Sequence, residues 1–218
     1  MKIRTVDQFL DRVSADRVWR IREIASLRSQ CYSHGLSQHV AMALRRSFVP
    51  IAYAHWEGFV KKAANYYLEF VAMQGLRLKD LNSSFMSIYL WRECSTSLSR
   101  GKHNSLVDVC NALMDRELHQ VRLHYKNVIS TNSNLDSRTL SDICLTLGVS
   151  FRVFETKTMF IDAKLVGQRN NIAHGENQEI TKESLEEIKD EVVLLIDLFR
   201  NEIENAAVSG SFLRVLPV

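Results

Sequence analysis

The chain has 218 residues, 46% of them hydrophobic, so it can bury a core and global disorder is excluded. Its 8 glycines and 2 prolines are few, which favours long helices over an architecture rich in turns. The formal net charge of +3 permits an anionic partner without requiring one.

The N-terminal part of the chain predicts two long helices. Thr5 can cap a first helix, whose apolar residues recur at helical spacing until Gly35 breaks it. A second helix is predicted from Ser37 to about Gln74. Pro50 lies inside this segment and is expected to kink or divide the helix.

The middle of the chain is less regular. Residues 76–103 have the pattern of an irregular insertion, after which helical spacing returns over about 105–125. The polar stretch 130–134 predicts a loop. Ser137 can cap a further helix that should end at Gly148.

Two more helices are predicted at the C-terminal end, a short one over roughly 157–171 and a long one over 182–205. There is no internal repeat and no strand-like alternation, so the fold is predicted to be all-α. We expect one domain over 1–218, a bundle of about five to seven helices. The last helix has the clearest apolar stripe: Leu185, Ile188, Val192, Leu195, Phe199 and Ile203.

The sequence predicts a cytoplasmic protein with no membrane segment. Its N-terminus lacks the apolar stretch of a signal peptide, and no run of 18 apolar residues occurs. The cysteines are spaced too widely for a metal-ligand pattern and are expected to be reduced thiols, so no metal or cofactor site is predicted. They are Cys31, Cys94, Cys110 and Cys144.

Residues 169–174 read Arg-Asn-Asn-Ile-Ala-His, and of all segments in the chain this one most resembles a catalytic site in its residue types. The guanidinium of Arg169 suits phosphate, and the imidazole of His174 can take and give a proton near neutral pH. In one continuous helix these residues would lie about 7.5 Å apart along the axis and about 140° apart around it. They can converge only if the helix ends close to Gly175, or if a second copy of the chain supplies the other half.

Asn170 shares a helix face with His174 and could orient its imidazole or contact phosphate. The motif with its trailing Gly175 resembles the catalytic motif of the HEPN superfamily, in its stand-alone prokaryotic nuclease branch. The resemblance extends over residues 5–205. It also rests on three other segments: Ala54-His55-Trp56-Glu57-Gly58-Phe59-Val60-Lys61, Asn134-Leu135-Asp136-Ser137 and Ile180-Thr181.

The resemblance implies a metal-independent endoribonuclease, usually a homodimer with a composite active site formed by both motifs. Arg169 and His174 take the catalytic roles together with Asn170. In the implied reaction a ribose 2′-OH attacks phosphorus, His174 transfers protons and Arg169 stabilises the added charge. The products would be a 2′,3′-cyclic phosphate and a 5′-OH. Glu57, Asn171 and Glu176 are expected to support the site.

The resemblance also implies a role as a toxin or antiphage defence effector, with an antitoxin or defence-system protein as a possible partner. Some HEPN toxins are silenced by modification of a tyrosine two residues after the histidine. Here that position is Glu176, so control by that route is not expected. The alternatives are a catalytically silent module that binds nucleotide or a protein partner, and a purely structural helical domain. The intact Arg169/His174 pair favours the ribonuclease.

Several other residues have two interpretations. Glu57 is either an active-site acid or half of a partly buried ion pair, and Trp56 is expected in the core or at an interface. His119 and His124, near Arg116 and Arg122, could form a stripe that faces RNA, although a solvated helix face is the commoner arrangement.

Overall fold

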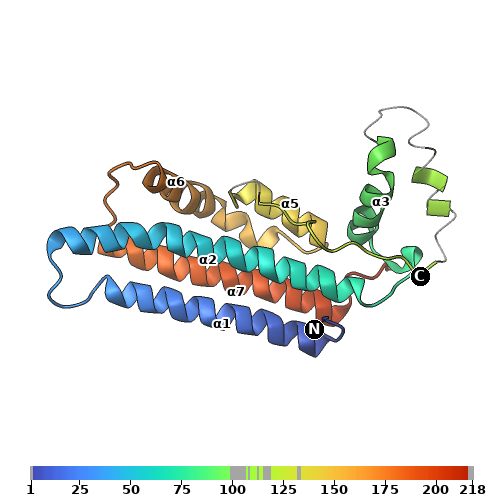
Figure 1. The fold of residues 1–218 in the computed structure, drawn as a ribbon, viewed down its shortest axis with the longest axis horizontal. Coiled ribbons are helices and arrows are strands. Elements are labelled where there is room, and N and C mark those ends of the chain that lie inside the picture. The colour runs from blue at the N-terminus through green and yellow to red at the C-terminus, as the bar shows by residue number, and fades with distance from the viewer. Residues whose placement is uncertain are drawn as a thin grey trace.

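The computed structural model describes residues 2–98, 107, 109–111, 113–114, 119–131 and 134–215. Three long helices form its body: α1 (Val6–Gln30), α2 (Gln38–Ala72) and α7 (Lys182–Ser209). They pack side by side along the long axis, with α1 antiparallel to the other two (Figure 1). The described residues contain no strand beyond two isolated bridges, so the all-α prediction is confirmed.

The long helices begin where the sequence predicts, because hydroxyl side chains cap their free N–H groups. Thr5 accepts a hydrogen bond from the backbone of Gln8 at 3.2 Å, and Ser37 and Thr181 cap α2 and α7 in the same way. The C-terminal helix extends beyond the predicted 182–205 to Ser209.

The core lies between these three helices and the shorter elements above them. Trp56 is fully buried, with its ring 6.5 Å from that of Phe154 and 6.4 Å from that of Phe199. This confirms the core position predicted for Trp56. Pro50 does not divide α2, which runs unbroken through it. The buried Val49 and Ala52 on either side hold the helix in the core despite the lost hydrogen bond.

The prediction of a helix over 105–125 is wrong for residues 119–125. The backbone of Val121 donates to Leu76 at 3.0 Å, and that of Leu78 donates to His119 at 3.3 Å. Residues 121–125 are not helical, because this segment pairs with the backbone of the insertion instead of with itself. Within 105–118, the described residues 107, 109–111 and 113–114 are helical, and the rest of the prediction lies outside the described residues.

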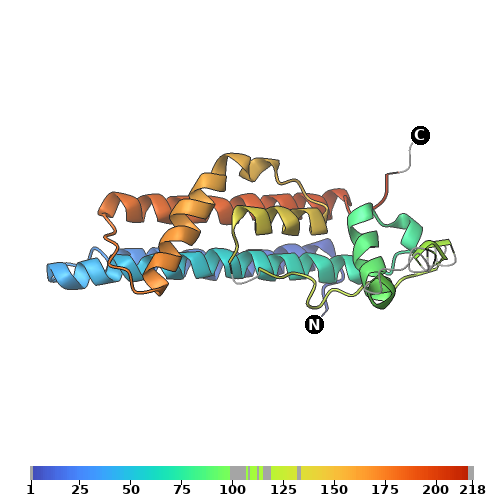
Figure 2. The ribbon, with the colours of Figure 1, turned by 90° about the horizontal axis from the view of Figure 1, so that it is seen from above.

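The shorter elements form a second layer across α2 and α7: α5 (Ser137–Leu147), η2 (Arg152–Lys157), η3 (Phe160–Gly167) and α6 (Gln168–Ala173) (Figure 2). The cap of α5 is Asp136, one residue before the predicted Ser137, and the helix ends at Gly148 as predicted. The insertion forms η1 (Leu78–Asp80) and α3 (Ser83–Leu98). It stands at the opposite end of the molecule from α6 (Figure 1).

Candidate functional site

The motif lies on a helix whose geometry changes just before it. η3, over Phe160–Gly167, is a π-helix, and α6 continues directly from it. A Cβ atom at Gly167 would lie 3.3 Å from the carbonyl oxygen of Asp162, so the side-chain-free residue suits this tight turn. Asp162 is itself fixed, because its carboxylate accepts hydrogen bonds from the backbone and hydroxyl of Ser137 at 2.7 and 2.6 Å.

The helix ends at the histidine of the motif. The backbone N–H of His174 still donates to the carbonyl of Asn170 at 2.9 Å, and Gly175 then turns the chain with a φ of 84°. This conformation favours glycine and is a common helix ending. The helix therefore ends where the sequence predicts. Because His174 keeps its helical hydrogen bond, the turn comes too late to swing its side chain onto the face of Arg169.

Arg169 is partly buried and points at an aromatic ring of the long helix α2. Its guanidinium carbon lies 4.5 Å from the centre of the Tyr53 ring, within range of a cation–π interaction. Its Nη1 also donates to the side-chain oxygen of Asn170 at 2.6 Å. The Asn170 oxygen, expected to orient His174 or contact phosphate, therefore accepts from Arg169 in this structure.

Tyr53 is buried beneath the guanidinium and connects it to Glu57. Its hydroxyl accepts a hydrogen bond from the backbone of Leu135 at 2.6 Å and makes a second one with the Glu57 side chain. Burial raises the pKa of Tyr53 to about 12, so the phenol is neutral at physiological pH and can donate to the carboxylate. The sequence offered a signal for this residue, since Tyr53 and Glu57 are four apart on one helix face.

Glu57 belongs to this polar network. Its carboxylate accepts from Lys61 at 3.1 Å and from the hydroxyl of the buried Thr131. Burial alone would raise the pKa of Glu57, yet its hydrogen bonds outweigh burial and hold that pKa below the ordinary value. Glu57 thus has an ion pair with Lys61 and is also connected to Arg169 through Tyr53. We call Arg169, Tyr53, Glu57 and Thr131 the arginine network.

His174 lies outside the arginine network and is exposed to solvent, as are Asn171 and Glu176. Asn171 and Glu176 are joined through their backbones, since the N–H of Glu176 donates to the carbonyl of Asn171 at 3.0 Å. One protomer thus presents a braced arginine and an exposed histidine on different sides of one short helix.

The loop that follows His174 is tied to the start of α2, which the sequence did not reveal. Arg45 donates to the carbonyl of Ile180 at 2.9 Å, and Arg46 donates to the side chain of Asn177 at 3.4 Å. A small hollow of about 200 Å³ lies between this loop and α2, with His39 on its wall. These contacts limit how far the loop carrying His174 can move.

Among the described residues, no group of three or more His, Cys, Asp or Glu side chains could hold a metal ion. Nor does any helix in the described ranges have the length and apolar character needed to cross a membrane.

The sequence model of one protein family, described as RiboL-PSP-HEPN, matches residues 15–205. This range contains the arginine network and His174. No curated protein and no solved structure matches the chain.

Proposed function

The chain belongs to the RiboL-PSP-HEPN family, and from this premise we propose that it is an endoribonuclease. HEPN domains often act as ribonucleases, which supports the general class. The finer proposal is metal-independent cleavage by 2′-OH attack, which leaves a 2′,3′-cyclic phosphate and a 5′-OH. The observation that carries it is the braced guanidinium of Arg169 over Tyr53, on the same short helix as the exposed His174.

The roles follow from the chemistry of the two side chains. Arg169 would hold the phosphate and stabilise the charge that develops on phosphorus, since its fork matches phosphate oxygens. His174 would transfer protons to or from the 2′-OH and the leaving oxygen. Asn170 would help to orient Arg169 through their hydrogen bond. Glu57 would act as a positioning residue, because it holds the hydroxyl of Tyr53.

The test is incubation of the purified protein with total cellular RNA in the presence of EDTA, followed by mapping of the new ends. Cyclic phosphate and 5′-OH ends would support the mechanism. Activity lost in EDTA and restored by magnesium would contradict it. A role as a toxin or defence effector predicts that expression arrests growth and that His174→Ala relieves the arrest. Binding of RNA without cleavage would point to a silent HEPN module.

We propose that the active form is a homodimer, in which both motifs line one cleft. Support comes from the helical hydrogen bond at His174, which leaves it and Arg169 on different sides of one protomer. We expect a mixture of Arg169→Ala and His174→Ala chains to regain roughly a quarter or more of the normal cleavage rate, because mixed dimers restore one complete pair. The rate is measured after the two chains are co-refolded. Mixtures no more active than either variant alone would contradict a composite site.

Tyr53 is proposed as a positioning residue for Arg169. Tyr53→Leu keeps apolar volume but removes the ring face, so kcat should fall about five- to tenfold, the kinetic equivalent of one cation–π interaction. Tyr53→Phe keeps the ring but loses the hydroxyl that Glu57 holds, so its kcat should fall less than that of Tyr53→Leu. The two variants are compared by steady-state kinetics at saturating RNA, with folding checked by circular dichroism. Equal kcat values in the two variants would show that the ring does not position Arg169.

A further inference from the structure

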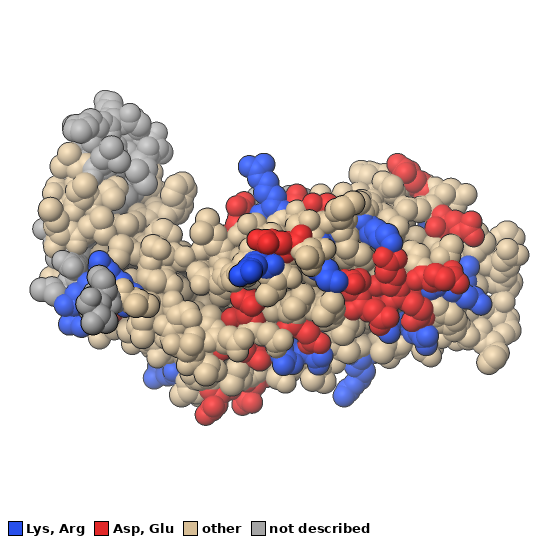
Figure 3. All heavy atoms as spheres, turned by 180° about the vertical axis from the view of Figure 1, so that it is seen from behind, with Lys and Arg blue, Asp and Glu red and all other residues tan. Residues whose placement is uncertain are grey.

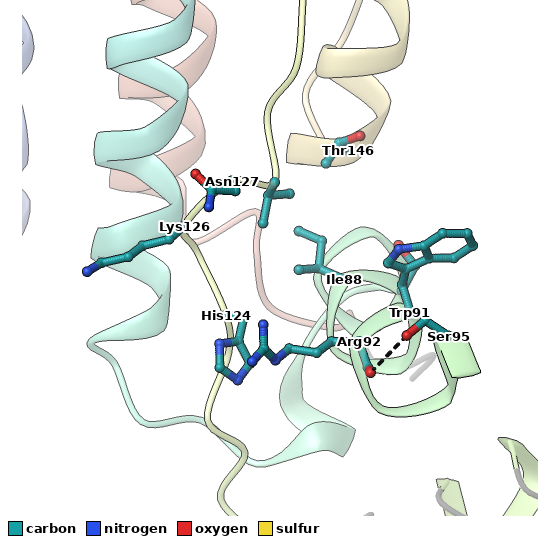
Figure 4. Close-up of a pocket in the computed structure, with 10 residues that line it drawn as sticks. Ile88, Trp91, Arg92, Ser95, His124, Lys126, Asn127 and Thr146 are labelled. Atoms are coloured by element: carbon teal, nitrogen blue, oxygen red, sulfur yellow. Dashed lines mark hydrogen bonds between the residues drawn. The ribbon is translucent and has the colours of Figure 1, made fainter. Parts of the chain in front are cut away.

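A second hollow lies at the other end of the molecule, far from α6. It has a volume of about 520 Å³ and is formed by α3, by the segment 124–128 and by the end of α5 (Figure 4). Neither the motif nor the arginine network reaches it. Its walls are lined by Ser87, Ile88, Trp91, Arg92, Ser95, His124, Lys126, Asn127, Val128 and Thr146.

One wall of this hollow presents an exposed tryptophan. Trp91 is 68% exposed, whereas Trp56 is completely buried in the core. The flat face of the Trp91 indole ring is open to stacking by a planar group. Ile88, three residues earlier on α3, also lines the hollow (Figure 4).

Beside Trp91 on α3, the hollow is also lined by the basic side chain of Arg92. Arg92 and His124 point toward one another across the hollow, and Lys126 extends away from its edge (Figure 4). The described lining residues include no carboxylate. The face over α7 is different: acidic side chains gather there (Figure 3), and several pair with lysines, as Glu187 does with Lys164. An anionic ligand would therefore meet less repulsion at the hollow than at the α7 face.

The hollow is connected to the arginine network by one segment of chain. Val128 lines the hollow, and Thr131, three residues later, donates to Glu57. Three residues of extended chain span at most roughly 10 Å. A strand of RNA that follows this segment out of the hollow would therefore reach the Thr131–Glu57 end of the arginine network.

We propose that this hollow, which we call the tryptophan groove, binds a single-stranded segment of RNA that flanks the cleaved bond. Trp91 would stack on one base, while Arg92 and His124 would contact the adjacent phosphate. Stacking on an aromatic ring beside cationic side chains is the usual chemistry of single-strand recognition. The choice of RNA rests on the proposed function, but the groove can be tested by binding alone.

The experiment measures binding of a fluorescein-labelled 12-nucleotide single-stranded RNA by fluorescence anisotropy, in the His174→Ala chain so that no cleavage intervenes. Trp91→Ala should raise Kd about five- to tenfold, and Trp91→Phe should recover most of the affinity. Arg92→Ala should raise Kd by a similar factor. It should also make the dependence of affinity on salt less steep: the negative slope of log K (the association constant) against log salt should shrink in magnitude by about 0.7, the value for one phosphate contact on a single strand. The matched control is Arg22→Ala, an exposed arginine on α1, which should change Kd less than twofold.

The outcomes separate the groove from the cleavage proposal. Unchanged affinity in both Trp91→Ala and Arg92→Ala would overturn the groove, even if the chain cleaves RNA. Weakened RNA binding in both variants, with no cleavage by the unsubstituted chain, would support the groove as an RNA-binding site and contradict the ribonuclease proposal. Competition by a polyglutamate peptide as effective as that by unlabelled RNA would show that the groove recognises charge alone, and would also overturn it.

Discussion

His174→Ala is expected to lower the rate of RNA cleavage by at least about 10²-fold, because positioned proton transfer typically contributes 10²- to 10⁴-fold. His174 is exposed at the end of α6, and its backbone is held by the hydrogen bond to Asn170. Loss of the imidazole should therefore leave the fold and RNA binding intact. The measurement is kcat and KM on a defined RNA, and the loss should fall on kcat.

The matched control is His34→Ala, because His34 is also exposed and lies in the turn between α1 and α2, outside the motif. Its cleavage rate should equal that of the unsubstituted chain. Full activity in His174→Ala would show that His174 is not catalytic. It would favour the alternative function, a catalytically silent HEPN module.

Arg169→Ala should lose a comparable amount, at least about 10²-fold, because the charge on the phosphorane would lack its partner in a partly dry site. The ring of Tyr53 and the side chain of Asn170 brace the guanidinium. Removing it also leaves the buried Tyr53 ring uncovered, so a modest loss of stability should accompany the loss of rate. Urea unfolding separates the two effects.

Comparison of Arg169→Lys with Arg169→Ala separates the effect of the charge from that of the guanidinium geometry. A lysine keeps the charge but has a single ammonium in place of the planar fork, so it cannot stack on Tyr53 and hold two phosphate oxygens together. We expect it to restore little of the lost rate. The double variant with His174→Ala should be scarcely slower than either single variant, since groups that act as a unit are not additive. Near-normal cleavage by Arg169→Lys would mean that charge alone suffices.

The long helices could be predicted from the sequence because their signals are local. The spacing of Leu185, Ile188 and Val192 places one face of α7 in the core, and Gly148 ends α5 by a backbone preference of its own. The segment 119–125 has the same spacing but was predicted wrongly, since its hydrogen bonds go to Leu76 and Leu78, far away in the sequence. Local periodicity does not carry that information.

In the candidate site, too, some features could be predicted from the sequence and others could not. Arg169 and His174 could be singled out from residue type and order, and the helix ending from Gly175. The stack of Arg169 on Tyr53 could not, because it depends on how α6 crosses α2. The anchoring of the loop by Arg45 and Arg46 is a tertiary contact as well. Both arginines would otherwise suggest an ordinary solvated helix face.

The π-helix before the motif gives this segment room for a change in its length. One residue more or fewer in an ordinary helix rotates everything after it by about 100°. Over Phe160–Gly167 the chain holds wider turns than an α-helix, so a deletion there could leave an unbroken helix of the normal kind. In that helix Arg169 would still lie close to the ring of Tyr53, because the loss of one residue and the larger rotation per residue of α turns nearly cancel. A related chain that lacks one residue within Phe160–Gly167 is therefore expected to keep the site, whereas one that lacks a residue within Gln168–Ala173 would change the angle between Arg169 and His174.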